Sequence, residues 1–120
     1  MQKATFLVHL LLLVAICNVA IASDLPDCDP LPVPVERVPP EYPIVESPLP
    51  VEGYAVVVYT ILESGEVEGI ELVESGSEPP HDGFARGFGR SAVRAISQWR
   101  YEPRQQACRS LQKFTFKLEE

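Results

Sequence analysis

The stretch from Phe84 to Pro103 constrains the fold more than any other part of this chain. Its apolar residues recur in steps of three and four, which places them on one face of a helix, while four arginines fall mostly on the other face. Proline lacks a backbone N–H and disfavours helix in the preceding residue, so the helix must end ahead of Pro103. The stretch therefore predicts an amphipathic helix that packs on an apolar surface. The apolar positions are Phe84, Phe88, Ala92, Val93, Ala95, Ile96 and Trp99.

Two glycines, Gly87 and Gly89, interrupt the first turns of that helix. Each costs about 1 kcal/mol relative to alanine in a helix interior, so we expect the firm part of the helix to begin near Phe88. Trp99 is the only tryptophan and lies where the helix gives way to the next element. The expected core anchors are Trp99, Tyr101 and Phe116.

Two alternating stretches flank the helix and predict strands. Residues 51–75 read as a β-hairpin whose turn, Glu63–Glu66, contains Gly65 for the positive φ that a short hairpin loop requires. The returning strand is out of phase near Glu68 and Gly69, which predicts a bulge there. Residues 75–83 read as a polar loop, residues 104–110 as another, and Leu111 to Leu118 as a last strand, with Phe114, Phe116 and Leu118 on one side.

The predicted order is ββαβ, a small α+β domain in which a three-stranded antiparallel sheet packs on one main helix. The first strand is apolar on both faces, which favours either a covering partner or self-association. We divide the chain into residues 1–22, a proline-rich linker at 23–50, and the folded domain at 51–120.

Residues 1–22 resemble a secretory signal, with Lys3, an apolar run and an A-x-A site that predicts cleavage after Ala22. An uncleaved membrane anchor over residues 4–22 is the alternative. Residues 23–50 hold most of the twelve prolines, a composition that favours extended polyproline II and a reach of at most about 90 Å. Whether this segment is a passive spacer or a stiff arm stays open.

Charge and cysteine content narrow the function classes. After residue 22 the chain has 9 basic and 17 acidic residues, so 9 − 17 = −8, which argues against nucleic acid as a partner. The exported part keeps two cysteines, Cys28 and Cys108, which predicts one disulfide.

No catalytic or metal site is predicted. His81–Asp82 is the only neighbouring His–carboxylate pair after residue 22, and it lies in a Pro/Gly-rich loop that would hold a general base poorly. One histidine and two distant cysteines do not make a zinc site, and there is no phosphate-binding glycine loop. We therefore expect neither enzymatic activity nor a metal or small-molecule cofactor.

The spacing of several motifs together resembles the TonB C-terminal domain family over residues 39–119. These motifs are Tyr42–Pro43, Gly53, Ser64–Gly65, Val67, residues 70–75, Trp99–Arg100–Tyr101–Glu102–Pro103 and Phe114–Thr115–Phe116–Lys117–Leu118. The resemblance implies a periplasmic module that binds a short segment of an outer-membrane receptor, the TonB box, and contributes to energy transduction. The segment would add a strand to the exposed edge of the sheet.

By resemblance the last strand is that edge, with Tyr42 and Pro43 close by as either binding residues or a lid on the core. The implied partner-binding residues are Tyr42, Pro43, Leu111, Lys113, Thr115 and Lys117. Two departures stand out: Pro48 and Pro50 interrupt what is often a short helix, and the proline-rich arm is short. The alternative function is a self-associating envelope protein, with a homodimer in place of the receptor segment and no energy transduction.

Overall fold

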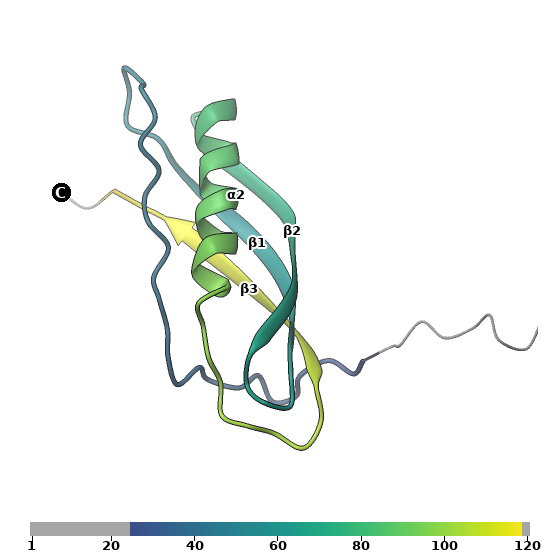
Figure 1. Cartoon of the computed structure of the whole chain (residues 1–120). Helices are drawn as coiled ribbons and strands as arrows, with labels where there is room; N and C mark the ends of the chain where they lie inside the picture. Colours follow the sequence, from purple (N-terminus) through teal and green to yellow (C-terminus); the bar gives the residue numbers. More distant parts are fainter. Residues whose placement is uncertain (1–24, 119–120) are drawn as a thin grey trace, which may run out of the picture.

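The apolar strand β1 (Glu52–Ile61) is the centre of the fold. In the computed structural model, which describes residues 25–118, β1 pairs antiparallel with β2 (Val67–Glu78) on one side and with β3 (Cys108–Phe116) on the other. The sheet order is therefore β2-β1-β3, and both β2 and β3 are edge strands. The predicted α+β fold, a three-stranded antiparallel sheet with one main helix, is confirmed for the described residues (Figure 1).

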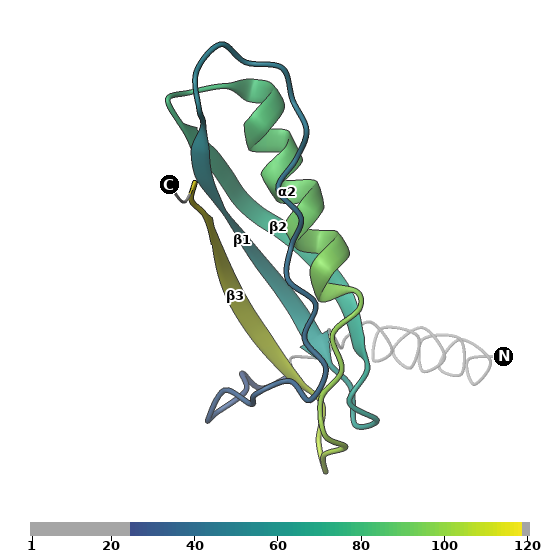
Figure 2. The ribbon, with the colours of Figure 1, turned by 90° about the vertical axis from the view of Figure 1, so that its left-hand side faces the viewer.

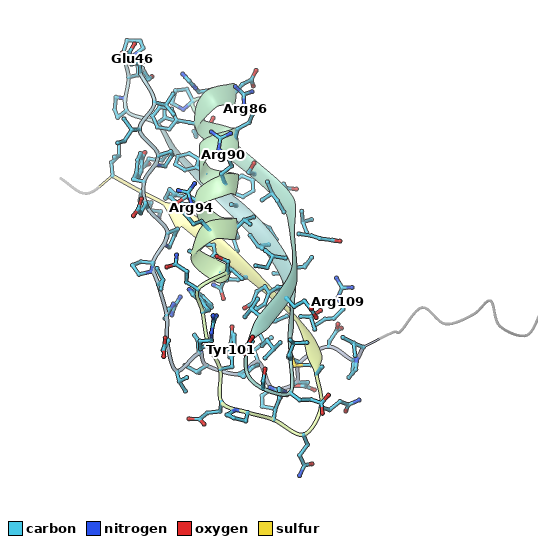
Figure 3. All side chains as sticks on the ribbon, viewed as in Figure 1. Glu46, Arg86, Arg90, Arg94, Tyr101 and Arg109 are labelled. Atoms are coloured by element: carbon cyan, nitrogen blue, oxygen red, sulfur yellow. A yellow bond between two sulfur atoms is a disulfide. The ribbon has the colours of Figure 1, made fainter. Side chains whose placement is uncertain are left out.

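Helix α2 (Asp82–Ile96) runs along one face of the sheet (Figures 1 and 2). Its apolar stripe meets the alternate side chains of β1 that point to the same face, as the periodicity predicts. The arginines of the helix lie on its exposed side, where Figure 3 labels Arg86, Arg90 and Arg94. The buried residues of α2 are Phe84, Gly87, Phe88, Gly89, Ser91, Ala92, Ala95 and Ile96.

The helix begins at Asp82, six residues earlier than expected, so the prediction of a late start near Phe88 was wrong. His81 is the N-cap, and its Nδ1 accepts the N–H of Phe84 at 3.2 Å, which satisfies one of the free donors of the first turn. The glycines serve close packing: a Cβ at Gly87 would lie 2.7 Å from Cβ of Pro43. Their cost in helix propensity is offset by the approach of a neighbouring segment.

The strand boundaries also differ from expectation. β2 continues to Glu78, through residues that were expected to form a loop. β3 begins at Cys108 and ends at Phe116, so it starts three residues before and ends two residues before the predicted strand. Pairing with β1 decides both differences, because Glu52 faces Glu78 and Ile61 faces Cys108 in the register.

The hairpin turn and the bulge agree with the sequence pattern. Gly65 has φ +92°, and the β1–β2 register shifts between Val58 and Thr60, opposite Gly69 at φ +62°. A second shift between Val56 and Val57 was not anticipated. It leaves Val73 as an extra residue in β2, with 59% of its surface exposed.

Residues 25–50 lie against the domain, and we call them the strap. The strap runs past the start of β3 and then beside α2 before it enters β1 (Figure 2). The carbonyl of Val38 accepts the indole N–H of Trp99 at 2.8 Å, and the carbonyl of Glu36 accepts the N–H of Arg100 at 3.1 Å. A reach of about 90 Å applies only to a detached segment, so over these contacts the strap is packed structure.

The core is aromatic at the point where helix, strap and β3 meet. Trp99 is 1% exposed, and Tyr101 and Phe116 are buried. The hydroxyl groups of Tyr59 and Tyr101 lie 2.7 Å apart and share a hydrogen bond inside the core. That bond satisfies two buried polar groups that would otherwise be costly.

Candidate functional site

Most of the outer edge of β3 has no paired strand among residues 25–118. The register of β3 on β1 has no irregularity from Cys108 to Phe116. Arg109 uses its N–H and C=O on the side away from β1, because both bond to the strap, at 2.8 Å each. Backbone groups alternate in direction along an antiparallel strand, so Leu111, Lys113 and Thr115 also direct their N–H and C=O away from β1.

The strap ends this free edge at its first residues. Pro26 and Cys28 exchange backbone hydrogen bonds with Arg109 in a short parallel bridge. A disulfide joins Cys28 to Cys108 at the start of β3, across a sequence separation of 80 residues. Within the part of the chain that the structure describes, the edge is therefore open from Leu111 to the end of the strand.

The opposite edge of the sheet has a different character. β2 has two register shifts in twelve residues, which break the regular ladder that an added strand needs. It also presents exposed acidic side chains. These are Glu68, Glu71, Glu74 and Glu78. Bulges and charges of this kind protect edge strands from pairing, so β3 is the more receptive edge.

Charge differs across the outer face of the sheet, the face opposite α2. In one row of the register, Glu74 of β2, Val56 of β1 and Lys113 of β3 are neighbours. Tyr54 lies between the charges: its hydroxyl donates to Glu74 at 2.6 Å, and the Lys113 ammonium lies 5.1 Å from the centre of its ring. This hydrogen bond holds the Glu74 carboxylate in place, and it raises the pKa of the Tyr54 hydroxyl that donates it.

Tyr42 and Pro43 lie over the core between α2 and the far end of β3. The Tyr42 ring makes edge contacts with Phe88 and Phe116, with ring centroids 5.5 and 6.2 Å apart. The neighbouring Pro43 packs on Gly87. Burial and the nearby Glu52 carboxylate raise the pKa of Tyr42, whose hydroxyl has no hydrogen-bond partner among residues 25–118. These contacts are those expected of a lid on the core. Of the other predicted binding residues, Leu111, Lys113 and Thr115 lie in β3, and Lys117 directly follows it.

His81 and Asp82, the neighbouring His–carboxylate pair of the sequence, lie at the start of α2. His81 is occupied as the helix cap, with Asp82 in the first turn. Within residues 25–118 there is no group of three or more His, Cys, Asp or Glu side chains placed to hold a metal ion. In the same part of the chain, no helix is long and apolar enough to cross a membrane. The predicted signal or anchor at residues 1–22 lies outside the described residues.

The role of the strap is the main feature that the sequence analysis missed. Proline spacing indicated an extended segment but not where it would lie. One signal was available: a bond between Cys28 and Cys108 requires residues near Cys28 to lie beside the start of the last strand. This covalent bond requires the strap to lie at the β3 edge.

Comparisons with known proteins agree with this geometry. Residues 38–118 match the sequence model of the family described as Gram-negative bacterial TonB protein, C-terminal. The chain is 32% identical over 71 residues to Protein TonB of Pseudomonas aeruginosa, an alignment that covers 59% of this chain and 19% of that relative. The chain thus spans about a fifth of the length of the curated relative that it matches.

A solved structure has a similar fold. The solution NMR structure of the Pseudomonas aeruginosa TonB C-terminal domain superposes with a TM-score of 0.54 at 29% sequence identity, over 73% of this chain and 87% of that chain. The family model also covers more than half of the 120 residues. The predicted family is therefore confirmed, and this chain belongs to the TonB C-terminal family of Gram-negative bacteria.

Proposed function

We propose that this chain is a periplasmic binding module that takes up an extended peptide segment as a fourth strand along β3. The observation that supports this most is the regular, open edge from Leu111 to Phe116. Main-chain groups on such an edge bind any extended segment, and side chains beside it select among segments. The family takes part in energy transduction to outer-membrane receptors, so the segment belongs to such a receptor.

The side chains beside the edge favour an acidic partner. Lys113 and Lys117 are exposed, and Arg109 precedes them on the same face of the strand. Opposite charges in directly facing positions on neighbouring strands stabilise a pair by about 0.2–1 kcal/mol. A receptor segment with acidic residues opposite these cations would therefore bind in a fixed register.

Export to the periplasm with cleavage after Ala22 is part of this proposal. The disulfide between Cys28 and Cys108 supports it, because such bonds persist in oxidising compartments outside the cytoplasm. A cleaved chain would be a free or accessory binding module, whereas an anchor at residues 4–22 would hold it at the inner membrane. Mass spectrometry of the mature protein, which identifies its N-terminal residue, distinguishes these two forms.

A proline scan along β3 tests the binding mode. Lys113→Pro and Thr115→Pro each remove an N–H that points away from β1, so both variants should stay folded and lose peptide binding. Phe114→Pro removes an N–H that pairs with β1 and should unfold the domain. Ser75→Pro, on the outward side of β2, is the matched control that should fold and still bind.

Trp99 fluorescence reports folding in these variants, and fluorescence anisotropy of a labelled receptor peptide reports binding. If Lys113→Pro and Thr115→Pro both stay folded and bind like the wild type, the β3 edge is not the site. If both unfold, the outward direction of their N–H groups is wrong.

A second candidate function is self-association through the outer face of the sheet. Each of two rows across that face runs from an acid on β2, through β1, to a base on β3: Glu74–Val56–Lys113 and Glu68–Thr60–Arg109. A two-fold axis parallel to the strands would place the acidic side of one copy over the basic side of the other. Self-association would then use charge complementarity around an apolar centre.

Charge reversal tests this candidate. Arg109→Glu/Lys113→Glu makes both sides of the face acidic, and Glu68→Lys/Glu74→Lys makes both sides basic. Each double variant should sediment as a monomer, and a 1:1 mixture should restore the dimer. A wild type that stays monomeric at high concentration, or a mixture that does, rejects the dimer.

A further inference from the structure

A hollow of about 310 Å³ lies beside the open edge, where the strap passes the start of β3. Two exposed apolar side chains of the strap line it, Leu31 at 64% and Val33 at 81% exposed, and Leu111 of β3 borders it through a position whose side chain alternates to the opposite face. Buried rings of Trp99 and Tyr101 also line it, and Tyr101 lies toward the same end of the molecule as Arg109 (Figure 3). Exposed apolar side chains gathered around one hollow indicate a contact surface.

The hollow is in register with the edge. Ser110 and Gln112 line it from β3, and their side chains point to the face of the sheet that α2 covers. Residues directly opposite each other on neighbouring strands point to the same face. In a strand added to β3, the side chain opposite Gln112 would therefore point toward the hollow.

The outer wall of the hollow is held in place before any partner binds. The disulfide and the bonds to Arg109 fix the strap at Cys28. The N–H groups of Val35 and Glu36 donate to the carbonyl of Arg100 at 2.8 and 3.1 Å and fix its other end. Leu31 and Val33 lie between these two attachments. The wall that they form is therefore already ordered, and little conformational entropy is lost there when a partner binds.

We propose that the strap is the specificity element of the β3 site. An extended acidic segment pairs with Leu111 to Thr115 and places one large apolar side chain in the hollow between Leu31, Val33 and Tyr101. Acidity of the segment follows from Lys113, which is exposed beside the edge on the face opposite the hollow. This inference rests on the proposed strand addition but goes further, because it assigns part of the recognition to a segment outside the sheet.

The experiment uses the exported chain and synthetic ten-residue peptides with acidic residues on one face of the strand and a single leucine on the other. The leucine is moved along the peptide in steps of two, and anisotropy measures each Kd. Leu31→Ser/Val33→Ser should weaken the best peptide about tenfold, the scale of one apolar side chain leaving a pocket. Val35→Ser is the matched control, since Val35 is 55% exposed on the same strap and does not line the hollow.

Two further arms identify the pocket as the cause. Replacing the peptide's leucine by serine should weaken binding to the wild type about tenfold and leave binding to Leu31→Ser/Val33→Ser unchanged. Cys28→Ser/Cys108→Ser should weaken the leucine peptide but not the serine peptide, because the wall loses one attachment.

The outcomes separate this inference from the function on which it rests. If peptides bind and Lys113→Pro abolishes binding, but the strap variants bind like Val35→Ser, the strap is not a specificity element and strand addition stands. If no peptide of the set binds the wild type, both proposals are rejected.

Discussion

The two edges of this sheet differ in every property that governs strand addition. β2 is twelve residues long, has two register shifts and exposes a row of glutamates, whereas β3 is nine residues long, regular throughout and basic. Both edge strands pair with the same central strand, β1, so the difference lies in the edge strands themselves. Under the proposed binding mode, an unbroken ladder of outward N–H and C=O groups matters more than the length of the edge strand.

The two sides of the fold also differ in what supports them. The β3 side rests on the aromatic core and on the strap, while the β2 side rests mainly on α2. Substitutions and conditions that weaken one side at a time test this difference, and their expected effects decrease in the order given.

Trp99→Ala should have the largest effect, about 3–5 kcal/mol of unfolding free energy, because it removes a large and fully buried ring. The ring packs edge-on against Phe114 of β3 at 5.7 Å between centroids, and its N–H holds the strap at Val38. Urea denaturation followed by circular dichroism measures the loss. An unchanged midpoint would show that the β3 side does not depend on this ring.

Cys28→Ser/Cys108→Ser should cost about 2–4 kcal/mol, somewhat less than the roughly 4–5 kcal/mol that the chain-entropy model gives for a loop of this length. The same urea titration measures it. Mass spectrometry after alkylation, with and without reductant, should first show one bridge within the monomer. Two free thiols in freshly exported protein would contradict the bond itself.

The sequence specified the parts of the fold that depend on local pattern. The period of the stretch after Phe84 predicts α2, and Gly65 and the phase change near Gly69 predict the turn and the bulge. The start of α2 could not be predicted this way, because Gly87 is tolerated through its contact with Pro43, far along the chain. Long-range packing there overrides helix propensity.

For the candidate site, the limit has the same physical origin. The residues along β3 follow from the family resemblance and strand alternation, but the start of the strand at Cys108 depends on its pairing with Ile61. The hollow beside it depends on where the strap lies. Proline spacing specifies an extended backbone and says nothing of the surface on which it packs.

Alkaline pH should weaken the β3 side next. Burial, and then the hydrogen bond to Tyr59, raise the pKa of Tyr101 above that of a free tyrosine, so the native state keeps the phenol neutral. Above pH 10 the unfolded chain loses this proton while the folded chain keeps it, so stability falls as pH rises, by at most about 1.4 kcal/mol per pH unit. Below pH 10 this residue adds no pH dependence.

Urea midpoints between pH 8 and 11.5 test the alkaline effect. Tyr101→Phe removes the titrating group, and its midpoint should fall less steeply above pH 10 than that of the wild type. Equal slopes in the two proteins would show that Tyr101 is not responsible.

Neutralising exposed charges should have the smallest effects on stability and on binding. Neutralising them on one edge at a time compares β2 and β3 directly. Lys113→Gln/Lys117→Gln should weaken an acidic peptide several-fold and reduce the salt dependence of binding, because exposed cations beside the edge attract it. Glu71→Gln/Glu74→Gln on β2 should leave affinity unchanged within twofold. Both variants should keep their stability within about 0.5 kcal/mol. Equal loss from the two edges would contradict the preference for β3.

Amide hydrogen exchange, measured by NMR with and without a bound receptor peptide, tests the central claim most directly. In the free protein the N–H groups of Gln112 and Phe114 should be protected by β1, and those of Lys113 and Thr115 should exchange quickly. Peptide binding should protect Lys113 and Thr115 and leave Ser75 of β2 unchanged. New protection along β2, or binding without any gain at Lys113 and Thr115, would show that the segment does not add to β3.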